Sequence, residues 1–126
     1  MKLEQQVVSL ELAKKLKELG VEQESLFYWC NHVQLGNLKS RQCSDYLIYG
    51  HQGWHERTRV SAFTVAELGE MLPAGALGAY LNIFKNVDKG WNVGYGLEVT
   101  LEADTEADAR AKMLIYLLEN NLIKNV

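Results

Sequence analysis

Between Trp91 and Glu102, apolar residues alternate without a break with residues that are polar or small. The apolar residues occupy the odd positions Trp91, Val93, Tyr95, Leu97, Val99 and Leu101. The even positions are Asn92, Gly94, Gly96, Glu98, Thr100 and Glu102. A period of two is the pattern of a β-strand with one buried face and one face toward water. The segment therefore predicts a single strand over 91–102 that buries every second side chain.

Three other segments carry the period and the end signals of helices. The first has the apolar stripe Val8, Leu12, Leu16 and Leu19, with Ser9 as N-cap and Gly20 as stop. In the second, Thr64 and Glu67 have the spacing of a capping box, and Pro73 ends the helix. The third begins at Asp104 or Thr105, and its wide apolar surface indicates a central helix.

Further short segments are rich in β-branched and aromatic residues, which is typical of strands. They lie at 25–33, at 45–50, near Val60 and at 79–85, with polar loops at 34–44 and 51–59. Residues 86–90 read as a hairpin connection, and large side chains on both faces of 25–33 suggest a strand that is covered on both sides. We therefore expect an α+β fold, with an antiparallel or mixed sheet of about four to five strands and three helices packed on it.

Length and composition place this fold in one domain over residues 1–126. A chain of 126 residues suits a single domain, and its only proline, Pro73, leaves no proline-rich linker. Two cysteines are too few for a disulfide-stapled secreted domain. The longest apolar run falls far short of the ~20 residues that cross a bilayer, and charges interrupt the N-terminal segment where a signal peptide is apolar. We expect a cytoplasmic protein that does not bind membranes.

Four stretches together resemble a known group of proteins. They are residues 8–20 with 24–29, residues 63–73, residues 80–85 with 91–95, and residues 105–121. These stretches resemble small proteins of bacterial prophages and mobile elements, a family similar to the phage α-β-α sandwich domain group and without an established activity. The resemblance skips residues 34–60; it implies a sheet with helices packed on it, and no catalytic residue. The polar even face of 92–102 departs from a full three-layer sandwich, because it predicts that part of the sheet meets water unless Gly94 and Gly96 admit another backbone.

Thiol and imidazole side chains gather within residues 30–55, at Cys30, His32, Cys43, His51 and His55. These groups suit zinc, and the spacing of the last two histidines occurs in zinc sites. The separation of the cysteines is not that of a zinc finger, and no CxxC pair is present. We expect no metal site and no cofactor, with Cys30 as a small buried core residue.

Two other sets of residues could in principle support catalysis or ion binding, and both are equally incomplete. Cys43, Asp45 and His51 are suitable types for nucleophilic catalysis but have no elbow motif around the cysteine. The acidic run Glu102, Asp104, Glu106 and Asp108 has the charge that a helix N-terminus favours without a ligand, and it lacks the pattern of a calcium loop. The sequence therefore predicts no catalytic residues.

A basic and aromatic patch is the remaining candidate site. It comprises Lys39, Arg41, Arg57 and Arg59, interleaved with Tyr46, Tyr49 and Trp54. Residues 31–60 hold four basic and two acidic side chains, a local charge of +2 in a chain of net charge −3. Two interpretations stay open. In the first, the protein is a non-catalytic interaction module that contacts another protein or its own copy through the aromatic residues. In the second, the 39–59 loop binds nucleic acid weakly, with Arg57 and Arg59 on phosphates.

Overall fold

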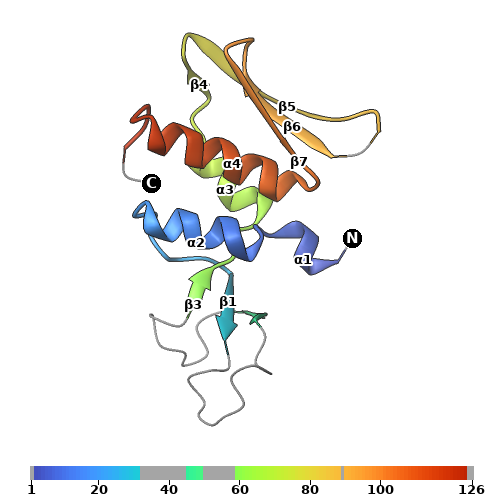
Figure 1. The fold of residues 1–126 in the computed structure, drawn as a ribbon, viewed down its shortest axis with the longest axis vertical. Helices are drawn as coiled ribbons and strands as arrows, with labels where there is room; N and C mark the ends of the chain where they lie inside the picture. The colour runs from blue at the N-terminus through green and yellow to red at the C-terminus, as the bar shows by residue number, and fades with distance from the viewer. Residues whose placement is uncertain (1, 32–44, 50–58, 89, 125–126) are drawn as a thin grey trace.

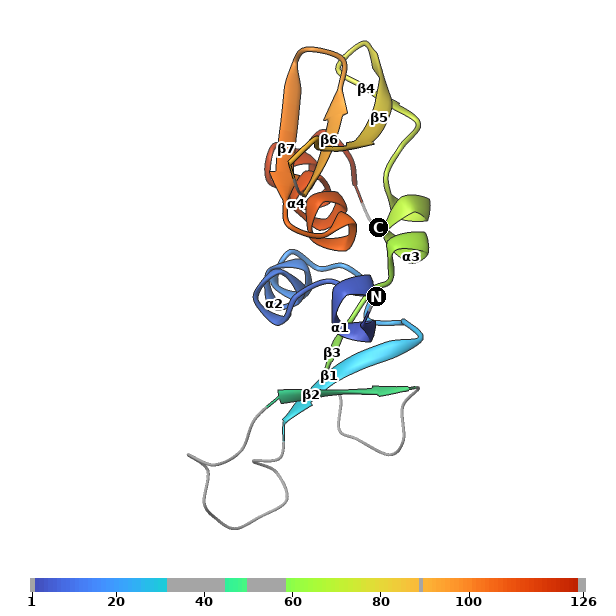
Figure 2. The ribbon, with the colours of Figure 1, turned by 90° about the vertical axis from the view of Figure 1, so that its right-hand side faces the viewer.

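The computed structural model describes residues 2–31, 45–49, 59–88 and 90–124. Within these ranges the chain is α+β, with four helices and two antiparallel sheets. The helices occupy the middle of the molecule, with the four-stranded sheet on one side and the three-stranded sheet on the other (Figures 1 and 2). The predicted packing of sheet on helices is confirmed. The layer order differs from a helix–sheet–helix sandwich, because the strands divide between two sheets outside the helices.

The three predicted helices are present, and a short one precedes them. The helices are α1 (Leu3–Gln6), α2 (Leu10–Glu18), α3 (Val65–Met71) and α4 (Glu106–Glu119). Thr64 and Glu67 form the expected capping box, and the Thr105 hydroxyl accepts from the N–H of Asp108. Ser9 is the N-cap of α2, but its hydroxyl makes no capping bond. None of the described helices is long and apolar enough to cross a bilayer.

The smaller sheet has the order β2-β1-β3, built from Phe27–Asn31 (β1), Asp45–Tyr49 (β2) and Arg59–Ser61 (β3). The two faces of β1 are both covered, to different degrees. Tyr28 and Cys30 on one face are fully buried, while Trp29 on the other is half-buried and packs against the main core. The indole Nε1 of Trp29 donates to the carbonyl of Val8 at 2.9 Å, which ties this sheet to the start of α2.

The larger sheet has the order β4-β5-β6-β7. Its strands are Gly75–Ala76 (β4), Ala79–Lys85 (β5), Trp91–Tyr95 (β6) and Val99–Ala103 (β7). β5 and β6 form the expected antiparallel pair, joined through residues 86–90. The short β4 was not predicted; it pairs with the first residues of β5.

The prediction of one strand over 91–102 was wrong, because β6 and β7 are the two arms of a hairpin. Gly96 adopts a φ of 59°, and Glu98 N–H donates to the Tyr95 carbonyl at 3.2 Å. The turn holds an odd number of residues, so Tyr95 pairs with Val99 and the odd-numbered side chains stay on one face throughout. Leu97, in the turn, is the exception and is 103% exposed.

The core lies between the larger sheet and the helices, with α4 at its centre. One side of α4 contacts β6 and β7, and other sides contact α2 and α3. Its buried side chains include Ala111, Met113, Leu114 and Leu117. Complete burial of a Leu or Met side chain stabilises a fold by about 1.5–3 kcal/mol. Because α4 covers only one face of the larger sheet, the opposite face is left toward solvent (Figure 2).

Candidate functional site

Only some residues of the basic and aromatic patch predicted from the sequence lie in the described part of the structure. Tyr46 and Tyr49 lie on β2, paired with Cys30 and Phe27, and their side chains are outside the described part of the chain. Trp54 and Arg57 also lie outside the described residues. The proposed contact surface at 39–59 therefore stays a prediction.

Arg59 is placed, and it is a buried residue of β3 that is 8% exposed. Its guanidinium carbon lies 4.8 Å from the centroid of the Tyr28 ring, a cation–π distance. The backbone carbonyl of Arg59 accepts from Lys17 Nζ at 3.0 Å. The side chain thus packs within the smaller sheet, and its positive charge is not displayed at the surface.

Cys30 is the described member of the thiol and imidazole group; His32, Cys43, His51 and His55 lie outside the described residues. Burial raises the pKa of the Cys30 thiol, and the charge of Arg59 lowers it to a smaller extent. A buried thiol with a raised pKa is a poor nucleophile, because the thiolate is the reactive form. Its environment is that of a core residue.

The outer face of the larger sheet is the candidate that the described residues support best. We define the outer face as the seven residues of β5, β6 and β7 on the side away from α4: Tyr80, Asn82, Phe84, Asn92, Gly94, Thr100 and Glu102. The strand register arranges them in rows. Asn82, Gly94 and Thr100 form one row, and Phe84, Asn92 and Glu102 form the next.

Two aromatic rings stand exposed on this face. Tyr80 is 85% exposed and Phe84 is 50% exposed. The contrast with the inner face is direct, since Tyr95 on β6 is fully buried and its hydroxyl donates to the Pro73 carbonyl at 2.8 Å. Single exposed apolar residues are common on protein surfaces, but here two rings lie on the same side of one strand, on a sheet face that no described helix covers.

The charges of the outer face are acidic. None of its seven residues is basic, and its one charged side chain is Glu102. Asn86 Nδ2 donates to Glu102 Oε2 at 3.5 Å, and Glu98 is exposed in the adjoining turn. Within the described structure, Asn92 Oδ1 is buried and has no hydrogen-bond donor. The face therefore offers ring surfaces and the Glu102 carboxylate, with a second carboxylate in the adjoining turn.

Gly94, at the middle of the face, lies close to β7. A Cβ on Gly94 would lie 2.8 Å from the Val99 carbonyl oxygen and 2.8 Å from Thr100 Oγ1. The Thr100 side chain therefore lies against Gly94, which is buried.

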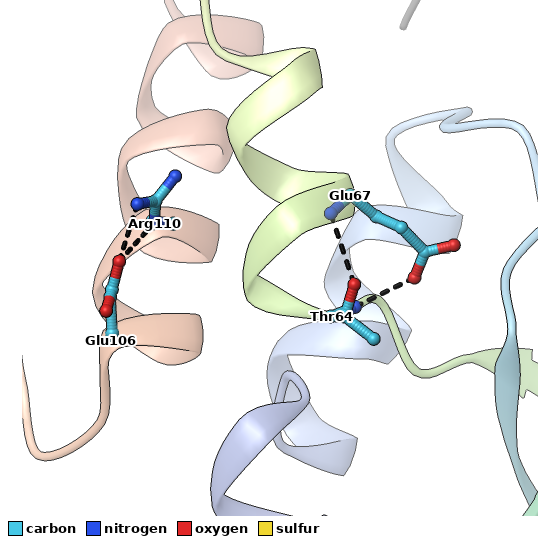
Figure 3. A network of polar contacts seen from close by, with 4 residues as sticks. All are labelled: Thr64, Glu67, Glu106 and Arg110. Carbon is cyan, nitrogen blue, oxygen red and sulfur yellow. Dashed lines mark hydrogen bonds and ion pairs between the residues drawn. The ribbon is translucent and has the colours of Figure 1, made fainter.

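Two hollows in the described part of the molecule are lined by acidic residues, several of which have structural tasks. One, of about 660 Å³, is lined in part by Glu24, Glu67 and Glu70. Glu67 accepts hydrogen bonds from the Ser25 hydroxyl and from Thr64 N–H, and so supports α3 and the entry to β1 (Figure 3).

The other hollow, of about 370 Å³, holds part of the acidic run, namely Glu102, Asp104 and Asp108. Asp108 accepts a bond from Ser9 N–H, and Glu106 pairs with Arg110 one helical turn away (Figure 3). Across the described residues, no group of three or more histidine, cysteine or acidic side chains is arranged to hold a metal ion. These acidic side chains serve helix ends and ion pairs.

Comparison with protein-family models, curated proteins and solved structures found no significant match. The candidate site is therefore argued from geometry. Sequence analysis missed it, although one signal was present. The even positions of 79–85 include Tyr80 and Phe84, whereas those of 91–102 are polar or glycine. Antiparallel pairing brings these two unlike sets onto one face.

Proposed function

We propose that this chain is a non-catalytic protein-interaction module that binds its partner through the outer face of the larger sheet. The exposure of Tyr80 and Phe84 is the observation that supports this proposal. Aromatic residues are enriched at the centres of protein interfaces, where each buries roughly 150–250 Å². Covering two rings that the fold leaves in water contributes binding free energy without any rearrangement of the core.

The biological setting is proposed from the sequence resemblance. We propose that the protein is an accessory factor of a prophage or mobile element that acts in the cytoplasm. The resemblance of the four stretches supports this setting, and the free, buried thiol of Cys30 is compatible with a reducing compartment.

A photo-cross-linking experiment tests the proposed surface. A benzoylphenylalanine residue is incorporated in place of Tyr80, or in place of Leu26 as the control, and the cells that naturally make the protein are irradiated. Leu26 is a matched site because it is 51% exposed and lies beside the smaller sheet. We expect a discrete protein adduct from residue 80 and none from residue 26. No adduct at residue 80, or equal adducts at both sites, would overturn the proposal.

Weak nucleic-acid binding through the 39–59 loop is the rival function. A DNA or RNA mobility-shift titration at several salt concentrations separates the two, since phosphate contacts weaken steeply with salt. Arg57→Ala is the informative variant. Arg59 is buried against Tyr28, so that its replacement would also disturb the fold. Salt-sensitive binding that Arg57→Ala abolishes would favour the rival.

A further inference from the structure

We propose that the partner segment held by the outer face is basic, carrying lysine or arginine side chains that lie between the rings of β5 and the carboxylates beside β7. This inference rests on the proposed function of the face and adds the chemistry of its partner. The placement of Phe84 and Glu102 in one row of the face supports it.

Rings and carboxylates occupy opposite sides of the face. Tyr80 and Phe84 lie on β5, whereas Glu102 lies on β7 in the same row as Phe84. Glu98 is exposed in the turn that follows the last strand pair, Tyr95 with Val99. The row of Phe84 therefore has one ring and one carboxylate, two strand spacings or about 10 Å apart.

A cationic side chain that lies in this row can contact both groups. Guanidinium and ammonium groups bind ring faces by cation–π attraction and bind carboxylates by charge-assisted hydrogen bonds. We therefore expect a basic residue of the partner segment to lie between Phe84 and Glu102.

Electrostatics disfavour two other occupants of the face. A second copy packed face to face would bring the carboxylates of both copies together, since the seven residues of the face include an acid and no base. A nucleic acid would bring phosphates to the same carboxylates. Like charges placed opposite each other suppress binding, whereas a basic segment neutralises them.

Recognition by the face, and not by the strand edge, is favoured at β7. Lys112 Nζ donates to the backbone carbonyl of Glu102 at 3.0 Å. A lysine beside an outer strand is a common device against pairing with another chain. The partner segment is thus read by its side chains.

The experiment selects ligands for the purified full chain from a random nine-residue peptide library, and titrates the selected peptides at 50 and 300 mM salt. We expect enrichment of lysine and arginine and weaker binding at the higher salt. Glu98→Gln with Glu102→Gln should weaken binding about three- to tenfold at low salt, as exposed charge pairs do. The matched control is Glu18→Gln with Glu22→Gln, which removes the same charge from exposed sites at α2 and should leave affinity unchanged.

The outcomes separate this inference from the proposed function. Tyr80→Ser with Phe84→Ser reports whether a peptide binds the face, with Leu26→Ser as its control. Neutral or acidic peptides that need the rings, or basic peptides indifferent to the loss of both carboxylates, would overturn the inference and leave the function standing. A dimer seen in analytical sedimentation that is lost in a Tyr80 variant would likewise overturn the inference and leave the proposed function standing. Failure of every selected peptide to need the rings, together with no cross-link at residue 80, would overturn both.

Discussion

The carboxylate of Asp108 accepts a hydrogen bond from the backbone N–H of Ser9, with 2.7 Å between the nitrogen and Oδ1. The two residues are 99 positions apart and stand at the starts of α4 and α2. One negative charge thus lies near two helix N-termini, where backbone dipoles favour it. The contact replaces the serine hydroxyl cap that the sequence predicts for α2, and it locks the two longest helices together.

Removing this carboxylate should destabilise the fold. We expect Asp108→Ala to lower the free energy of unfolding by about 1.5–3 kcal/mol, because a hydrogen bond to a charged group is lost. Asp108→Asn retains an oxygen acceptor and should cost less. Urea denaturation measures the effect, with Asp104→Ala as the control, since Asp104 is exposed one turn earlier. A change of under about 0.5 kcal/mol for Asp108→Ala, which is the size of ordinary surface effects, would contradict this role.

Trp29 provides the corresponding link to the smaller sheet. Trp29→Phe keeps most of the packing but removes the donor to the Val8 carbonyl, and Val8 is fully buried. An unsatisfied buried acceptor costs about 1–3 kcal/mol, and we expect a loss of that size in thermal or urea unfolding. Equal free energies of unfolding for wild type and Trp29→Phe would show that this hydrogen bond does not hold the smaller sheet to the helices.

Gly69 on α3 and Arg110 on α4 should be energetically coupled. A Cβ on Gly69 would collide with Arg110 Nη1, and Arg110 is paired with Glu106. Alanine in a helix interior is normally more stable than glycine by about 0.5–1 kcal/mol. We expect Gly69→Ala to stabilise an Arg110→Ala background by this amount, and to stabilise the wild type less or to destabilise it. A double-mutant cycle measures the difference, and additive effects would contradict the contact.

Tyr95 should make the fold sensitive to high pH. Burial raises the pKa of Tyr95 to about 12. Its stabilising contribution is complete below pH 10, where the unfolded tyrosine is also protonated, and is lost as pH rises toward 12. Linkage predicts that the wild type loses about 2 kcal/mol more than Tyr95→Phe between pH 9 and 11.5. Tyr80→Phe controls for the loss of a hydroxyl in these denaturation curves, and parallel pH profiles for wild type and Tyr95→Phe would refute the prediction.

The helices could be predicted from sequence because their signals are local. Thr64 with Glu67, and Thr105 with Asp108, form caps within three residues. The apolar stripe of each helix indicates which of its sides is buried. The hairpin at Gly96 could not be distinguished from a continuous strand by periodicity. A turn with an odd number of residues preserves the alternation, so that only the glycine marked the reversal.

Strand pairing determines both the division into two sheets and the candidate site. Local sequence patterns do not reveal which strands pair. Tyr80 and Phe84 look like core residues of a strand until β6 places Asn92 and Gly94 beside them. Arg59 similarly looked solvent-facing, because its basic character predicts exposure. Its partner, the Tyr28 ring, lies on a different strand, and the pair is visible only after β1 and β3 are paired.

The most direct test of the outer face as a binding surface measures stability and partner binding on the same variant, Tyr80→Ser with Phe84→Ser. Tyr80 is 85% exposed and Phe84 is half-buried, so we expect the free energy of unfolding to fall by no more than about 1–2 kcal/mol. We expect this double variant to lose binding to the partner that the cross-linking experiment identifies, whereas Leu26→Ser should keep that binding. Undiminished partner binding, or a drop in stability of several kcal/mol, would contradict the account.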